Sequence, residues 1–228
     1  WGGVVQTAGD GGRIGGSGSM TELDTEASVD IAGRYLRMVS GGGIGSGANA
    51  VEVAVDRLAA QAVGGIYLTE SDGLEIDDVS VTVVRVAADG GSAPITDALL
   101  SDVVASGPGS AVVITVLDGD LDLNDGSIGT GVSVGNGGTG NILLQVSQGD
   151  LVISDGAGLR SMGGSITLRS GSGVVFVGTP EVSTVGGGSV YVLAQSGSVR
   201  MSGFENYIDN FQPSQSVIHN FSTVKLIK

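Results

Sequence analysis

Six aspartates lie in two neighbouring segments of the chain: Asp118, Asp120, Asp122 and Asp125 in the first, and Asp150 and Asp155 in the second. Asp150 and Asp155 hold the places of Asp120 and Asp125 thirty residues further along. If the two segments stack in phase, Asp120 lies about one strand spacing, ~4.8 Å, from Asp150. Carboxylates at that distance repel each other unless a cation or water separates them. The pattern therefore suggests Ca²⁺ bound by oxygens of Asp120, Asp122, Asp125, Asp150 and Asp155.

A simpler interpretation of these aspartates is a solvated acidic edge that discourages aggregation of exposed strands. We favour this interpretation over the Ca²⁺ site. A second acidic cluster admits the same two interpretations: Glu70, Asp72, Glu75, Asp77 and Asp78. The Gly-Gly-x-Gly-x-Asp rhythm of repeat-in-toxin calcium sites is not present in tandem. Calcium is thus a hypothesis for this chain, and it is the one cofactor that the sequence suggests.

Catalysis by two carboxylates is the other chemistry that this segment could support. Asp120 and Asp122 point to the same side of an extended strand and lie roughly 6.5–7 Å apart, a separation that fits inverting glycosidases. However, the single histidine, His219, lies far from them in the sequence. The aspartate segment also contains no Arg or Lys that could act as a lyase base. We therefore assign no catalytic residues and expect a protein that is not an enzyme.

The elements that would position these residues are short strands that repeat at a fixed step. Segments 141–146, 165–170 and 189–194 align at a step of 24 residues, and in each the alternate positions carry Ile, Leu, Val or a small residue. This period-2 pattern is typical of a strand with one buried side. A glycine follows each segment at the same offset, and a second short strand comes next. Repetition at this period predicts a β-solenoid.

The same strand, turn and strand unit can be followed upstream at less regular steps. Residues 112–126 match residues 142–156 at a spacing of 30, and residues 65–76 repeat the unit again. The extra residues fall in the Gly/Ser/Thr-rich segment 126–140, where a loop can lengthen without disturbing stacked strands. At roughly 24 residues per turn, the chain of 228 residues predicts an all-β parallel solenoid of about nine coils.

Composition agrees with a solenoid built from tight turns. The chain has 42 glycines, no cysteine and a positive mean hydropathy. Glycine supplies the positive-φ corners between strands, whereas a flexible linker would lack the ordered Val/Ile/Leu alternation. One segment, residues 54–62, has helical character, and it is short. We expect a core of stacked columns, of which one contains Leu144, Leu168 and Val192.

The last 25 residues differ from the repeats. We therefore divide the chain into a β-solenoid, residues 1–203, and an atypical C-terminal segment, residues 204–228. Four aromatic residues lie in that segment: Phe204, Tyr207, Phe211 and Phe221. An open solenoid end exposes unpaired backbone and core side chains, so a bulky segment is expected to cap it. Alternatively, these aromatics form an interface with the next subunit of a filament.

Residues 40–60 read SGGGIGSGANAVEVAVDRLAA and continue into residues 64–74. This segment resembles the recurring unit of very large secreted bacterial repeat proteins, similar to the filamentous-haemagglutinin type of adhesin. The resemblance is one of general sequence pattern, and it covers residues 28–203. It implies a right-handed parallel β-helix that is exported to the cell surface or medium and acts as a stalk, adhesin or matrix component. Its partners would be glycans or proteins of host or other cell surfaces, or copies of itself.

Charge and hydropathy exclude several other classes of protein. The formal net charge is −14 with ten Lys and Arg residues, whereas phosphate binding needs clustered basic side chains. Nucleic acid is therefore not an expected partner. The same charge disfavours anionic membrane surfaces, and there is no run of about 18 apolar residues that would predict a membrane span. The N-terminus has no charged region followed by an apolar core, so we expect an internal or processed fragment of a longer exported chain.

We therefore expect a non-catalytic, extracellular structural or adhesive β-solenoid. It would be a stalk or adhesin segment of a large bacterial surface protein, or else a filament subunit that docks end to end. A polysaccharide-cleaving β-helix enzyme is the remaining alternative. Binding would be spread over the strand faces and the longer loops, at residues 41–49, 87–100 and 126–140.

Overall fold

The computed structural model describes residues 5–6, 11–22, 28–127, 129–202, 217–221 and 223–225. Within these residues the secondary structure consists of strands, with no helix. The expected all-β architecture is therefore confirmed. It follows that this part of the chain contains no helix that is long and apolar enough to cross a membrane.

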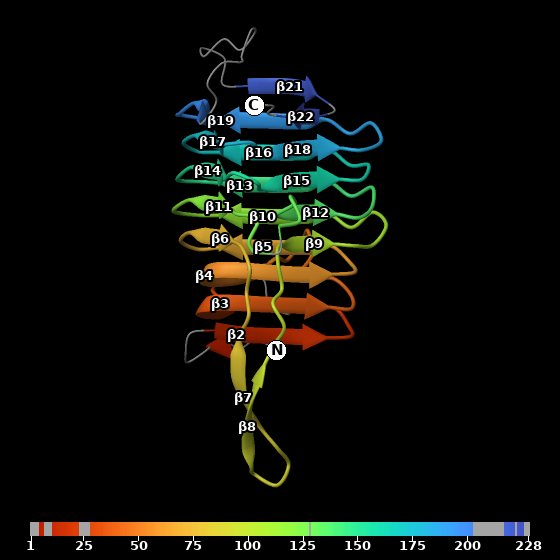
Figure 1. Cartoon of the computed structure of the whole chain (residues 1–228), viewed down its shortest axis with the longest axis vertical. Coiled ribbons are helices and arrows are strands. Elements are labelled where there is room, and N and C mark those ends of the chain that lie inside the picture. The colour runs from red at the N-terminus through yellow and green to blue at the C-terminus, as the bar shows by residue number, and fades with distance from the viewer. Residues whose placement is uncertain are drawn as a thin grey trace.

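Successive strands stack in parallel, one winding of the chain above the previous one (Figure 1). Ile142 pairs with Ile166, and Ile166 pairs with Val190, so the predicted step of 24 residues is confirmed by the strand register. Val112 pairs with Ile142, which confirms the spacing of 30 upstream. Each residue thus lies about 4.8 Å from its counterpart in the next winding. The fold is a parallel β-solenoid.

Each regular winding contributes one strand to each of three stacks. The first stack contains β5 (Ile66–Glu70), β10 (Val112–Val116), β13 (Ile142–Val146), β16 (Ile166–Ser170) and β19 (Val190–Ala194). The second contains β6 (Leu74–Ile76), β11 (Leu121–Leu123), β14 (Leu151–Ile153), β17 (Val174–Val177) and β20 (Val199–Ser202). The third contains β9 (Val103–Ala105), β12 (Val134–Asn136), β15 (Gly158–Ser161) and β18 (Glu181–Thr184).

The third stack is a correction to the sequence prediction, which has two strands in each coil and a loop over residues 126–140. β12 lies inside that segment and pairs with β9 and β15. Strands of the third stack are three or four residues long, and β12 lies within a Gly/Ser/Thr-rich segment, so its local sequence resembles a loop. They become strands because neighbouring windings hold their backbone groups in register.

The N-terminal windings use longer strands. β3 (Ile31–Ser40) pairs with β4 (Val51–Ala62), and β1 (Val5–Gln6) and β2 (Gly11–Gly16) pair with β3. β4 spans all three stacks, because it pairs in turn with β5, β6 and β9. The helical character assigned to residues 54–62 is therefore wrong. Strand partners along both edges of this segment outweigh its local preference.

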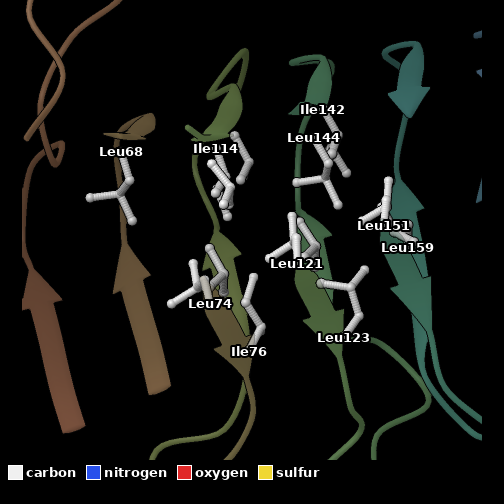
Figure 2. Packing of buried hydrophobic residues seen from close by; sticks show 14 of the residues in the cluster. Leu68, Leu74, Ile76, Ile114, Leu121, Leu123, Ile142, Leu144, Leu151 and Leu159 are labelled. Carbon is white, nitrogen blue, oxygen red and sulfur yellow. The ribbon is translucent and has the colours of Figure 1, made fainter. Parts of the chain in front are cut away.

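The core consists of columns of aliphatic side chains that run along the solenoid (Figure 2). Ile114 and Leu144 are fully buried and pair in register, as do Leu121 and Leu151 in the second stack. The expected stacked columns are therefore confirmed. Each such side chain contributes roughly 1.5–3 kcal/mol through its burial. Because much of that burial is provided by the windings above and below, no single winding has a core of its own.

An antiparallel hairpin leaves the solenoid between β6 and β9. β7 (Thr82–Val86) and β8 (Ser92–Thr96) pair with each other, and Figure 1 shows them extending past the β2 end of the stack. The base of the hairpin packs on the outside of β4 through the buried side chains of Val79 and Val81. The loop expected over residues 87–100 is thus partly strand.

Two strands of the C-terminal segment pair with the last regular winding. β21 (Val217–Phe221) is antiparallel to β19, and β22 (Thr223–Lys225) is antiparallel to β18. This reversal ends the parallel stacking at these two strands. Three of the predicted interface residues lie outside the described residues: Phe204, Tyr207 and Phe211. The side chain of Phe221 is not described either, so the boundary after residue 203 and the role of the aromatics stay predictions.

Candidate functional site

Three of the predicted metal-binding aspartates act as hydrogen-bond acceptors between successive windings. Asp120 Oδ1 accepts a hydrogen bond from the backbone N–H of Asp150 at 2.7 Å. Asp150 Oδ1 in turn accepts the N–H of Gly173, and Asp155 Oδ1 accepts the N–H of Thr179, both at 2.7 Å. We call this arrangement the aspartate ladder. Each carboxylate satisfies a backbone donor of the next winding at a turn, where no strand partner does so.

The other two predicted metal ligands lie outside the aspartate ladder. Asp122 lies in β11 beside Glu75 of β6, and burial, followed by the carboxylates of Asp120 and Glu75, raises its pKa. Asp125 Oδ1 accepts the N–H of Gly131 at 2.7 Å. Within the described residues, no three carboxylates of the predicted set converge on one point. Ca²⁺ binding by these five aspartates stays a prediction.

An arginine of β4 pairs with the second acidic cluster. Arg57 Nη2 lies 2.7 Å from Glu75 Oε2, and Arg57 Nη1 lies 3.4 Å from Asp77 Oδ2. The guanidinium also lies 5.8 Å from the centre of the Tyr35 ring. Asn124 of the next winding donates to Glu75 Oε1 at 2.6 Å. These partly exposed pairs contribute roughly 0–1 kcal/mol each, and they fasten β4 to the windings that follow.

Within the described residues, three carboxylates for which the sequence made no prediction converge, those of Glu22, Asp30 and Glu52. One oxygen of each lies within 4.8 Å of an oxygen of the other two. Asp30 and Glu52 are neighbours because Ile31 pairs with Val53, and the Glu52 N–H donates to Asp30 Oδ2 at 3.2 Å. Burial raises the pKa of Glu52, and the charge of Asp30 adds to the rise. This carboxylate triad is a set of hard oxygen ligands that could hold a divalent cation.

A groove of about 420 Å³ lies beside the carboxylate triad. Glu52 belongs to both, and the rest of the lining comes from the loop before β4 and from β5 and β10, including Asn49, Tyr67, Thr69 and Thr115. The Asn49 amide donates to the backbone oxygen of Glu22 at 3.4 Å, which ties the loop to the triad. The groove therefore offers one aromatic ring together with hydroxyl, amide and carboxylate groups, the functional groups that a hydroxyl-rich ligand needs.

Beyond the groove, the outer side of the first stack carries two rows of side chains that we call the outer ladder. The register aligns one row through Thr69, Thr115, Gln145 and Arg169. The second row begins at Tyr67 and ends at Tyr191. Arg169 Nη1 donates to Gln145 Oε1 at 3.4 Å. With about 4.8 Å between strands, the five strands of the stack make this surface about 19 Å long.

Glu70 is a fully buried carboxylate, although the sequence prediction places it in an acidic cluster that is either solvated or metal-binding. It ends β5 at a core position that Val116 occupies in β10. Oε1 accepts the N–H of Ser71 at 2.8 Å, and Oε2 accepts the N–H of Val55 at 3.1 Å. Burial raises its pKa to about 8, and the side chain of Asp72 adds to the rise. The alternation along β5 is the signal that could have placed Glu70 inside.

In comparisons with family models, curated proteins and solved structures, nothing matches this sequence. The resemblance to bacterial repeat adhesins therefore stays a prediction. The groove, the carboxylate triad and the outer ladder are the features from which a function can be inferred.

Proposed function

We propose that this chain is an extracellular structural and adhesive β-solenoid, a stalk or adhesin segment of a large bacterial surface protein that binds cell-surface glycans. The observation that carries this proposal is the outer ladder. Parallel register from β5 to β16 aligns Tyr67, Thr69, Thr115, Gln145 and Arg169 on one side, next to the groove, and Leu193 of β19 ends the row. One row of this elongated surface is polar over four successive strands, and the other includes Val113 and Leu143, so the surface suits an elongated ligand better than a compact one.

The ligand class that this surface favours is a neutral polysaccharide. Threonine hydroxyls, the Gln145 amide and the Arg169 guanidinium offer donors and acceptors that repeat at about 4.8 Å. Tyr67 offers an aromatic ring at one end. The net charge of −14 disfavours polyanionic ligands, because they would be repelled by the field of the whole molecule.

The action of such a protein is mechanical. We infer that about nine coils wind in the right-handed sense, because nearly all crossovers between parallel strands have that hand. At about 4.8 Å per coil, the rod spans roughly 40 Å. Columns of buried aliphatic side chains stiffen it along its length, so that the outer ladder is held at a distance from the cell.

Binding to a panel of purified neutral and acidic polysaccharides tests the proposal, with titration calorimetry on any that bind. We expect Tyr67→Ala to weaken binding about tenfold, the loss that ~1.4 kcal/mol produces. Arg200→Ala is the matched control, because Arg200 lies in β20 of the second stack and is exposed. Equal losses in both variants, or no binding to any polysaccharide, would contradict the proposal. Release of reducing ends would favour the enzyme alternative instead.

A filament subunit is the second candidate function. The observation in its favour is the β7–β8 hairpin, which extends past the β2 end of the stack and exposes Val84 and Val86 by 66% and 68%. Among the described strands, β2 pairs with β3 alone, so its other edge can accept a further strand. Electron microscopy of the purified protein distinguishes the candidates, because a filament subunit forms continuous fibres and a stalk segment forms single short rods.

A further inference from the structure

The base of the hairpin brings together side chains that are distant in the sequence. Val79 and Leu100 exchange two backbone hydrogen bonds, at 2.8 and 3.0 Å, as an antiparallel pair. Asp78 precedes Val79 and Ser101 follows Leu100, so the two lie opposite each other where the hairpin joins the solenoid. Asp102 comes next, directly before β9. We call Asp78, Ser101 and Asp102 the hairpin-base cluster.

Three buried oxygen atoms of this cluster have no hydrogen-bond partner among the described residues: Asp78 Oδ1, Ser101 Oγ and Asp102 Oδ1. The second oxygen of each carboxylate does have one. Asp78 Oδ2 accepts both the hydroxyl and the N–H of Ser127, the latter at 2.6 Å. Asp102 Oδ2 accepts the hydroxyl of Thr130 at 3.0 Å. A buried oxygen atom normally has a hydrogen-bond partner, and the three remaining oxygens have none among the described residues. Their lack of partners points to a bound ligand.

The members of the cluster, which the Val79–Leu100 pair brings together, also act on one another's pKa. Burial raises the pKa of Asp102 to about 6, while the hydroxyls of Thr130 and Ser101 oppose the rise and the carboxylate of Asp78 adds to it. Burial also acts to raise the pKa of Asp78, but the hydrogen bonds from Ser127 lower it, and the nearby hydroxyl of Ser101, whose geometry does not make a hydrogen bond, acts in the same direction. Ser101 thus influences both carboxylates, and the carboxylates influence each other.

Asp102 is an unfavourable position for an uncompensated charge. It is 3% exposed, and with a φ of 72° it is the one non-glycine residue of the described chain in the left-handed region. A buried carboxylate costs several kcal/mol unless a counter-charge and hydrogen bonds compensate it. No described ion pair includes Asp102, and Arg57, whose charge acts on Asp78, is already bound to Glu75 and Asp77. A cation at this point would supply the missing charge.

We propose that the hairpin-base cluster holds one hard cation, with Ca²⁺ the best match. Two carboxylates and a hydroxyl, without nitrogen or sulfur donors, are ligands that Ca²⁺ accepts, and Ca²⁺ tolerates irregular coordination better than Mg²⁺ does. A Cβ at residue 126 would collide with Asp78 Oδ1, so the glycine at this position keeps the space beside that oxygen free of a side chain. Water completes the coordination from a groove of about 620 Å³ that Asp78 lines. The ion clamps both strands of the hairpin base to the solenoid.

Calcium titration of the full chain after treatment with a chelator tests this proposal. We expect a bound ion by calorimetry and a higher Tm in the presence of Ca²⁺. Asp102→Asn removes one charge and keeps the backbone, because asparagine tolerates a positive φ, and it should weaken binding by about tenfold or more. Glu52→Gln in the carboxylate triad and Asp150→Asn in the aspartate ladder are the matched controls. Both should retain the affinity of the hairpin-base cluster.

Two results overturn the proposal. One is the absence of both heat and a shift in Tm at millimolar Ca²⁺. A buried water molecule would then be the hydrogen-bond partner of the three oxygens. The other is undiminished binding by Asp102→Asn together with loss of binding by Glu52→Gln or Asp150→Asn. If circular dichroism shows that Asp102→Asn does not fold, Ser101→Ala replaces it as the test. Unchanged Ca²⁺ affinity in the folded Ser101→Ala protein then overturns the proposal as well.

Discussion

The carboxylate of Glu70 accepts the backbone N–H of Val55 at 3.1 Å, inside the solenoid and across two successive windings. β4 runs straight through this point, whereas the next winding turns between β5 and β6. The ladder between them covers residues 51–53 and 57–58 of β4 and is interrupted in between. A side-chain oxygen takes the place of the missing backbone acceptor. Glu70 therefore marks the change from long, continuous strands to windings with a turn.

Glu70 gives the first prediction, a fall in stability as the pH rises. Its pKa lies at about 8 in the folded protein and at 4.5 in an unfolded chain, so the folded state holds one more proton between these values. The free energy of unfolding then decreases through this window, by up to about 5 kcal/mol, and this contribution is fully present only below pH 4.5. Urea melts of the wild type and of Glu70→Gln across this range measure the effect.

We expect the difference in unfolding free energy between wild type and Glu70→Gln to depend on pH in this window, because glutamine does not titrate. Asp72 is the titratable side chain beside Glu70 and is unchanged in the variant. Glu181→Gln, at an exposed position of β18, is the control and should show the wild-type pH dependence. Parallel curves for wild type and Glu70→Gln would refute the assignment.

The second prediction concerns the phase of the strands. Leu168 is fully buried in β16, whereas Thr167 beside it points outward and is partly exposed. Leu168→Asp places a charge in a column shared with the windings on both sides, so we expect a loss of at least about 3 kcal/mol. Thr167→Asp should change stability by no more than about 0.5 kcal/mol. Equal destabilisation of the two variants in urea melts would count against this orientation.

The third prediction tests how closely the windings approach at one corner. A Cβ at Gly164 would collide with the backbone oxygen of Gly140 in the previous winding, and one at Gly188 would collide with that of Gly164. We expect Gly164→Ala to cost about 1–3 kcal/mol, because the backbones must separate. Gly16→Ala is the matched control, since a Cβ there has no atom within 4 Å. It should be neutral or stabilising by up to about 1 kcal/mol, and thermal melts of the two variants decide the matter.

The fourth prediction addresses the C-terminal segment. Deleting residues 204–228 removes β21 and β22, which pair with β19 and β18. If the segment is a cap, the truncated protein should aggregate or unfold at a lower temperature, because two strand edges lose their partners. If it docks on another subunit, the truncated protein should remain a soluble monomer. Size-exclusion chromatography and thermal melts separate these outcomes.

Much of the fold could be predicted because a solenoid repeats its own sequence. The step from Ile142 to Ile166 to Val190 predicts which residues stack, and the spacing of 30 predicts that Asp120 lies next to Asp150. The direction of the Asp120 side chain could not be predicted, because a carboxylate that accepts a backbone N–H and one that faces an ion occupy the same place in the repeat. The same limit applies to Arg57, whose partners lie 18 and 20 residues away in another winding.

By itself, the sequence determined the strand period, the stacking step and the aliphatic columns, since these follow from local alternation and from self-similarity along the chain. Tertiary structure alone decided the third stack, the burial of Glu70 and the meeting of Asp78 with Ser101 and Asp102. Each of these depends on whether backbone groups of distant windings form hydrogen bonds with a given polar atom. Such pairings are set by the register of the assembled rod, and no single segment carries that information.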